Sequence, residues 1–193
     1  MGLREVLKEQ TQVSHRQIED NPLLKMIFST DLKKQTYIEI LSGFYGFIRS
    51  LEEVIRRLNP EFEGYLQKAD WLMSDLKSLG HSLQVEESNY SQSVKTSAQA
   101  LGALYVLEGS MLGGQMIIRH LKKFDFITPQ SSHYYTGYGD STGENWKSFL
   151  ALLNEHEQNY PHQNEVVVTS AIETFKALDN WFLKLYQRDS NIT

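Results

Sequence analysis

Apolar residues in this chain recur every three to four positions, in stretches separated by short polar segments. This spacing predicts helices, because it puts apolar side chains on one face of a helix with 3.6 residues per turn. No stretch shows the strict apolar–polar alternation that is typical of strands. We therefore expect an all-α, multi-helix bundle forming one domain over residues 1–193. Its main predicted helices cover residues 3–18, 31–58, 68–79, 94–124, 144–158 and 161–186.

The predicted helix 94–124 contains the segment LGALYVLEGSMLGG (residues 101–114), which has four glycines. Each glycine destabilises a helix interior by about 1 kcal/mol relative to alanine. Gly102, Gly109 and Gly113 fall on one helical face, because they are seven and four residues apart. A face without Cβ atoms lets a flat ligand approach the backbone and permits a bend. Close packing of another helix would explain the same glycines, and both interpretations are open at this point.

Composition narrows the classes of function. The chain has 40% apolar and 22% charged residues, which is typical of a globular protein. A net charge of −5 and the lack of any arginine- or lysine-rich run argue against nucleic-acid binding. The chain has no cysteine, so disulfides, thiolate catalysis and thiolate ligands to a metal are excluded. We see no signal peptide and no apolar run of the roughly 20 residues that cross a membrane, and we expect a cytoplasmic protein.

The segment Leu104–Gly114, LYVLEGSMLGG, resembles the distal-helix signature of the heme oxygenases, particularly bacterial ones associated with bacteriophytochromes. In that family the helix bends over the heme face where dioxygen binds, and its glycines make room for the ring. The resemblance implies that Gly109, Ser110 and Gly113 form the catalytic, oxygen-binding side of the site. Ser110 stands where animal members of the family have an aspartate that orders water, so the water network must differ.

The first predicted helix carries a second motif of the same family. Lys8 and Thr11 share a helical face with His15, and Lys8 lies roughly 10 Å from it along the axis. A lone helical histidine is most often a surface residue or a capped core residue. The motif Leu-x-x-x-Leu-Lys-x-x-Thr-x-x-x-His, here starting at Leu3, resembles the opening helix of heme oxygenases. The resemblance implies that His15 is the metal ligand, on the proximal side of heme b (iron protoporphyrin IX), with Lys8 and Thr11 beside it.

Other parts of the chain extend the resemblance. The segment around Tyr45 matches an aromatic Phe-Tyr-Gly-Phe stretch of the family, which implies that Tyr45 approaches the cofactor. Lys147 matches a lysine that pairs with a heme propionate, although Ala151 replaces the second basic residue of animal members. Phe175 and Phe182 lie on the last helix, at positions that imply contacts with the heme pocket.

The resemblance implies that heme is both cofactor and substrate, cleaved by dioxygen to biliverdin, carbon monoxide and ferrous iron. Electrons must come from an external donor, a ferredoxin or a reductase, because no flavin or nicotinamide fingerprint is present. The resemblance makes a bacteriophytochrome one candidate acceptor of the biliverdin, and the sequence leaves this role open beside iron acquisition.

Three other functions use the same fold. A heme carrier or sensor would need the same pocket without turnover. The diiron oxidases of this fold need converging carboxylates and histidines, and the chain has no Glu-x-x-His or Asp-x-x-His. Thiaminase-like enzymes use a cysteine nucleophile, which is absent here.

Overall fold

The computed structural model describes residues 2–190. This part of the chain folds into helices without a strand, which confirms the predicted fold class. The α-helices are α1 (Leu3–Glu19), α2 (Pro22–Lys25), α3 (Lys34–Leu58), α4 (Lys68–Ser78), α5 (Ser97–Leu121), α6 (His133–Thr136), α7 (Thr142–Asn159) and α8 (Asn164–Ser190). The 3₁₀ turns are Met26–Phe28, Pro60–Tyr65, Tyr90–Ser93, Pro129–Ser131, Gly139–Ser141 and Pro161–Gln163.

Helix ends follow local hydrogen bonding. The Thr96 side chain accepts from the backbone N–H of Gln99, and the Gln99 side chain accepts from Thr96, which closes a capping box. This cap starts α5 three residues later than the predicted start at residue 94, and the helix ends at Leu121 rather than 124. Gly80 follows α4 with a φ of +79°, a conformation that glycine adopts without strain.

The three glycines and the proline between residues 126 and 143 predict a loop that packs against the core, and the structure forms short helical turns within it. The glycines and the proline of this segment favour turns, yet Tyr134 and Tyr135 are 3% and 5% exposed and belong to the one-turn helix α6. Gly137 and Gly139 have φ values of +53° and +58°, so they supply the turns on either side of Tyr138. Burial of the two tyrosines explains why a segment rich in turn residues packs down onto α4 and α5.

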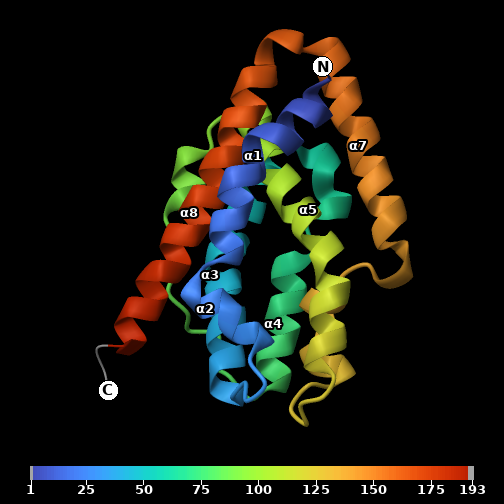
Figure 1. Ribbon diagram of the computed structural model, residues 1–193. Coiled ribbons are helices and arrows are strands. Elements are labelled where there is room, and N and C mark those ends of the chain that lie inside the picture. The colour runs from blue at the N-terminus through green and yellow to red at the C-terminus, as the bar shows by residue number, and fades with distance from the viewer. Residues whose placement is uncertain (1, 191–193) are drawn as a thin grey trace.

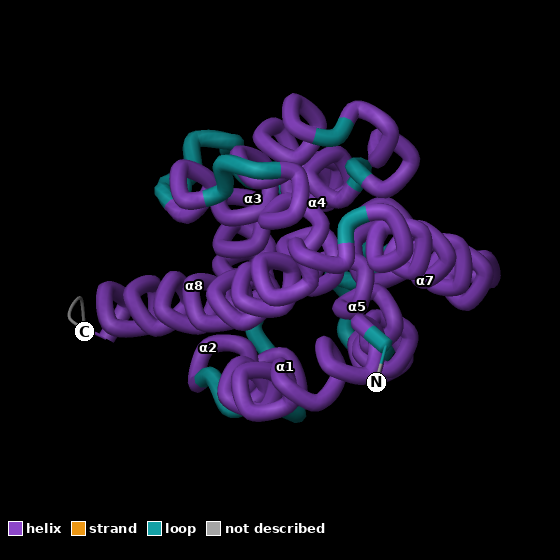
Figure 2. Tube along the Cα trace, turned by 90° about the horizontal axis from the view of Figure 1, so that it is seen from above, coloured by secondary structure: helices purple, strands orange, loops and turns teal. Residues whose placement is uncertain are grey.

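The long helices form layers around α8. Viewed from above, α8 passes between α3 and α4 on one side and α1 and α2 on the other (Figure 2). The most extensive helix–helix contacts are those of α8 with α5 and with α1. The core includes Leu7 of α1, Tyr37 and Phe47 of α3, Leu104 of α5 and Phe182 of α8, all at most 1% exposed.

α5 remains helical through all four of its glycines, and its axis bends between its upper and lower parts (Figure 1). Its 25 residues, with a mean hydropathy of 1.3 in the most apolar window, would suffice to cross a membrane. The sequence interpretation that no apolar segment reaches this length is therefore wrong. More than half of that window is buried inside the bundle, at 56%, so α5 is the central core helix of the fold.

Candidate functional site

α5 is contacted at two places by the first part of the chain, once by α1 and once by the 3₁₀ turn Met26–Phe28. Thr11 is 4% exposed, and its side chain lies close to the hydroxyl of Tyr105 of α5. Further along, Phe28 packs edge-on against His120 of α5, with ring centroids 5.6 Å apart. The α5 segment between these contacts is roughly 22 Å long at 1.5 Å per residue. Figure 1 shows α1 and α5 close together in the upper part of the molecule and diverging below it.

The α5 segment between the two contacts has an open apolar face. Gly109, Leu112, Gly113 and Met116 share this face, because they are three or four residues apart. A Cβ at Gly113 would meet no atom within 4 Å, and one at Gly109 would meet only Trp146 Cη2, at 3.9 Å. Leu112 is 46% exposed and Met116 is 66% exposed. Contiguous exposed apolar residues on a core helix mark a binding surface.

The other two glycines of α5 are packed. A Cβ at Gly102 would lie 2.3 Å from the carbonyl oxygen of Val167 in α8. A Cβ at Gly114 would lie 2.6 Å from the carbonyl oxygen of Tyr135 in α6. The predicted stripe of Gly102, Gly109 and Gly113 is therefore wrong at Gly102, where helix packing explains the glycine. The other two members of the stripe face open space.

His15 lies on the face of α1 that leads toward this opening. It follows Thr11 by one helical turn, as Gly109 follows Tyr105 by one turn on α5. The His15 side chain is 53% exposed, and its Nδ1 is 3.5 Å from Glu19. Its ring meets the ring of Phe175 edge-on, with centroids 5.5 Å apart. A mid-helix, half-exposed histidine is neither a cap nor a core residue, so it is available to a ligand.

α7 borders the opening next to Gly109. Trp146 packs against Tyr105, with ring centroids 5.8 Å apart, and stacks on Phe149 at 5.5 Å. Lys147 follows Trp146 and is exposed, and Lys8 is exposed on α1. The structure thus supplies an aromatic wall next to Gly109, and the pairing of the two exposed lysines with ligand carboxylates stays a prediction.

The Ser110 side chain interacts with its own helix, α5, and lies beside α6. Its hydroxyl donates to the carbonyl oxygen of Leu107 over 2.8 Å and lies close to the hydroxyl of Tyr134 of α6. Burial raises the pKa of Tyr134, so this phenol stays protonated at neutral pH. Ser110 and Tyr134 therefore place two hydroxyl groups close together on this side of α5.

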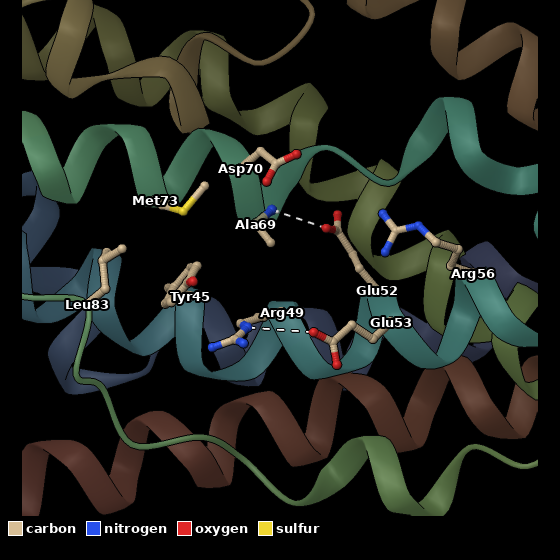
Figure 3. Close-up of a pocket in the computed structure, with 9 residues that line it drawn as sticks. All are labelled: Tyr45, Arg49, Glu52, Glu53, Arg56, Ala69, Asp70, Met73 and Leu83. Atoms are coloured by element: carbon tan, nitrogen blue, oxygen red, sulfur yellow. Dashed lines mark hydrogen bonds and ion pairs between the residues drawn. The ribbon is translucent and has the colours of Figure 1, made fainter.

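Two predicted contact residues lie elsewhere. Tyr45 lines a pocket of about 360 Å³ between α3 and α4, where Glu52 accepts a hydrogen bond from the Ala69 N–H (Figure 3). Phe182 is 0% exposed and packs against Phe44 of α3, with centroids 4.8 Å apart. The structure does not bring either residue to the opening between α1 and α5. Their aromatic character reflects core packing.

One buried cluster was missed at the sequence level. The Lys68 ammonium of α4 forms an ion pair with Glu108 of α5, and both side chains are at most 1% exposed. Tyr138 donates a hydrogen bond to the same Glu108 carboxylate over 3.1 Å. The available signal was a lone glutamate directly after the apolar run of residues 101–107 and a tyrosine between two glycines.

The sequence is similar to known proteins over most of its length. The sequence matches the family model described as "Heme oxygenase" over residues 1–184. It is 28% identical to a heme oxygenase of Xanthomonas campestris over 128 residues, 64% of this chain and 75% of the relative. It is 26% identical to the heme oxygenase PigA of Pseudomonas aeruginosa over 153 residues, 77% of this chain and 76% of the relative.

Solved structures share the architecture. A heme oxygenase from Leptospira interrogans superposes with a TM-score of 0.79 at 19% identity, covering 95% of this chain and all of that one (100%). The NO- and CO-bound heme oxygenase of Neisseria meningitidis gives 0.77 at 22% identity, covering 97% and 93%. A cyanobacterial heme oxygenase from Synechocystis, solved in complex with heme, gives 0.74 at 16% identity, covering 100% and 97%.

Proposed function

This chain belongs to the heme oxygenase family, an oxidoreductase family that degrades heme, and we propose that it binds one heme between α1 and α5. The products would be biliverdin, carbon monoxide and ferrous iron. The observation that carries the proposal is the open backbone of Gly109 and Gly113 on a face that also exposes Leu112 and Met116. A flat apolar ring can lie directly on such a face.

The residues present fit a heme. His15 offers an imidazole nitrogen on α1, and the chain has no cysteine that would act as an axial thiolate. Gly109 and Gly113 offer only backbone on the opposite side, so they supply no second axial donor. This combination suits a site that admits dioxygen, whereas electron-transfer cytochromes hold the iron with two strong ligands.

The protein's own groups would orient the substrate and keep it dry. Heme, when bound, supplies both the iron that activates dioxygen and the ring that is opened. Lys8 and Lys147 would pair with the propionates at the rim, and Trp146 and Phe175 would pack against the ring edge. The Ser110 and Tyr134 hydroxyls would provide hydrogen bonds near the oxygen-binding side, where the position carries no carboxylate.

We propose further that the protein works in the cytoplasm and receives electrons from a ferredoxin or a reductase. The likeness of residues 104–114 to phytochrome-associated oxygenases supports biliverdin supply to a bacteriophytochrome as the biological role. Nowhere in residues 2–190 do three histidine, aspartate or glutamate side chains converge to hold a metal ion, which argues against a diiron oxidase.

Replacement of His15 tests the proposal directly. Anaerobic titration of the wild type with heme should saturate at about one equivalent, and later addition of reductant and oxygen should yield biliverdin. His15→Ala should bind heme without its protein axial nitrogen, and turnover should be lost unless imidazole is added. His162→Ala, at an exposed histidine beyond α7, is the matched control and should behave as wild type.

A fully active His15→Ala variant would refute the assignment of His15. Stable heme binding by the wild type without turnover under reductant and oxygen would instead identify a heme carrier or sensor.

A further inference from the structure

A charged pair is buried behind the open face of α5. Lys68 and Glu108 have side chains that are 0% and 1% exposed. The Lys68 ammonium donates to Glu108, to the carbonyl oxygen of Tyr65 over 2.8 Å and to the Tyr138 hydroxyl over 3.4 Å. Both charges are therefore paired, and the ammonium has an acceptor for each of its three protons.

Tyr138 is held toward this pair by its loop. The glycines on either side of it both have positive φ values, +53° and +58°, which turn the chain sharply at this point. Trp71 of α4 packs edge-on against the Tyr138 ring, with centroids 5.1 Å apart. Burial and the neighbouring Glu108 carboxylate raise the pKa of Tyr138, so its hydroxyl remains a donor.

The cluster joins three elements at the edge of the proposed heme site. Glu108 directly precedes Gly109, whose backbone faces the opening. Tyr138 lies four residues before α7 begins at Thr142. One turn into α7, Trp146 covers Gly109 at 3.9 Å from its ideal Cβ position. Glu108 and Tyr138 thus link the floor of the site on α5 to its wall on α7, and Lys68 links both to α4.

Stability alone does not explain a buried ion pair. Removing two charges from water costs free energy that their attraction repays only in part, and apolar side chains of similar volume often serve equally well. Hydrogen bonds to a buried carboxylate instead fix direction and distance, because each bond has a narrow geometry. The cluster therefore fixes the position of α5 relative to the start of α7.

We propose that Lys68, Glu108 and Tyr138 are positioning residues that fix Gly109 relative to Trp146 and so determine how heme is seated in the site. The inference rests on the proposed function. None of the three side chains needs to touch heme, because they act through the α5 backbone and the α7 entry.

Tyr138→Phe tests the proposal with the least disturbance, because it removes one hydroxyl and keeps the Lys68–Glu108 pair. We expect the dissociation constant for heme to rise by about three- to tenfold, the value of one net hydrogen bond. The absorption spectrum of the bound heme and the ratio of biliverdin isomers should change as well, because the ring would sit differently. Both readouts are insensitive to a uniform loss of stability.

Tyr90→Phe is the matched control. The Tyr90 hydroxyl is 2.8 Å from Thr174 of α8, so the control also removes a hydroxyl that is hydrogen-bonded in the interior, but away from the open face. It should lower Tm by a few degrees, at roughly 2–4 °C per kcal/mol for a domain of this size, and leave the heme spectrum and the isomer ratio unchanged.

The double variant Lys68→Met/Glu108→Leu keeps the site apolar and filled, and tests the pair itself. It should fold and show the same altered spectrum and isomer ratio as Tyr138→Phe. Wild-type spectra, affinity and isomer ratio in both variants would overturn the positioning role. Failure of the wild type to bind heme would overturn the proposed function, and this inference with it.

Discussion

Gly113 and Gly114 are neighbours on α5, yet they exist for different reasons. A Cβ at Gly114 would lie 2.6 Å from the backbone of α6, whereas a Cβ at Gly113 would meet nothing within 4 Å. One residue along a helix is a rotation of about 100°, which is enough to move a side chain from a packed face to an open one. Gly114 lets the protein pack on itself, and Gly113 leaves room for something else.

Gly102 and Gly109 repeat the contrast along one face. They are seven residues apart and point in nearly the same direction, but α8 covers Gly102 and only the edge of Trp146 approaches Gly109. Helical periodicity therefore identifies a shared face without identifying what lies against it. The neighbouring helix changes along the length of α5, and that change separates packing glycines from ligand glycines.

Gly113→Leu should give the largest effect, a loss of activity without a loss of fold. Leucine favours a helix by roughly 0.8 kcal/mol over glycine, and its Cβ meets open space, so the fold should persist. The added side chain should occupy the proposed heme or oxygen space. Because a misplacement of about 1 Å can cost on the order of 100-fold in rate, we expect single-turnover biliverdin yield to fall to that extent.

The measurement compares Tm and single-turnover yield on the same preparation of Gly113→Leu. A variant with lower Tm and a normal yield per folded molecule would contradict the ligand interpretation and favour packing for Gly113 as well.

Lys8→Ala and Lys147→Ala test whether the open side of α5 binds the carboxylates of a ligand. Each lysine is exposed and has no burial in the bundle to lose. If each ammonium pairs with a ligand carboxylate, its removal should weaken heme binding by about 1–3 kcal/mol, the range for hydrogen bonds to charged groups. Heme titrations followed by absorbance measure this change.

Lys34→Ala, at an exposed lysine that begins α3, is the control for loss of surface charge and should leave the affinity unchanged. Unchanged affinity in both rim variants would mean that the propionates point elsewhere.

Most of the fold could be predicted because it depends on local signals. The 3.6-residue pattern located the long helices, and local residue types also fix their starts, as where Asn21 caps α2 and Pro22 is its first residue. Helix ends were less accurate, since a capping box such as Thr96–Gln99 decides them within a few residues. The segment around Tyr134 was predicted as a packed loop, and its one-turn helix was missed because turn residues dominate the local pattern.

The site residues could be predicted from the sequence only where they belong to a family motif. Tyr45 and Phe182 lie on helices where aromatic residues at helical spacing fit both a core and a pocket, and the structure packs Phe182 into the core against α3. The Lys68–Glu108 pair joins residues 40 positions apart, a pairing that no local pattern contains. Long-range contacts of this kind need the fold itself.

Single alanine substitutions at Gly102, Gly113 and Gly114 should give the smallest and most specific effects, all on stability. Gly114→Ala and Gly102→Ala place a methyl group against backbone carbonyls at 2.6 and 2.3 Å, which must move to accept it. Overpacking of this kind costs about 1–3 kcal/mol. Gly113→Ala meets no neighbour and removes a helix-destabilising glycine, so the free energy of unfolding should rise by up to about 1 kcal/mol.

Thermal denaturation without heme measures these changes. Tm should fall in Gly114→Ala and Gly102→Ala and rise in Gly113→Ala, at roughly 2–4 °C per kcal/mol. Omitting heme isolates packing from binding, since no ligand then stabilises the native state. Equal losses at Gly113 and Gly114 would show that both glycines pack, and the open face of α5 would then lose its principal support.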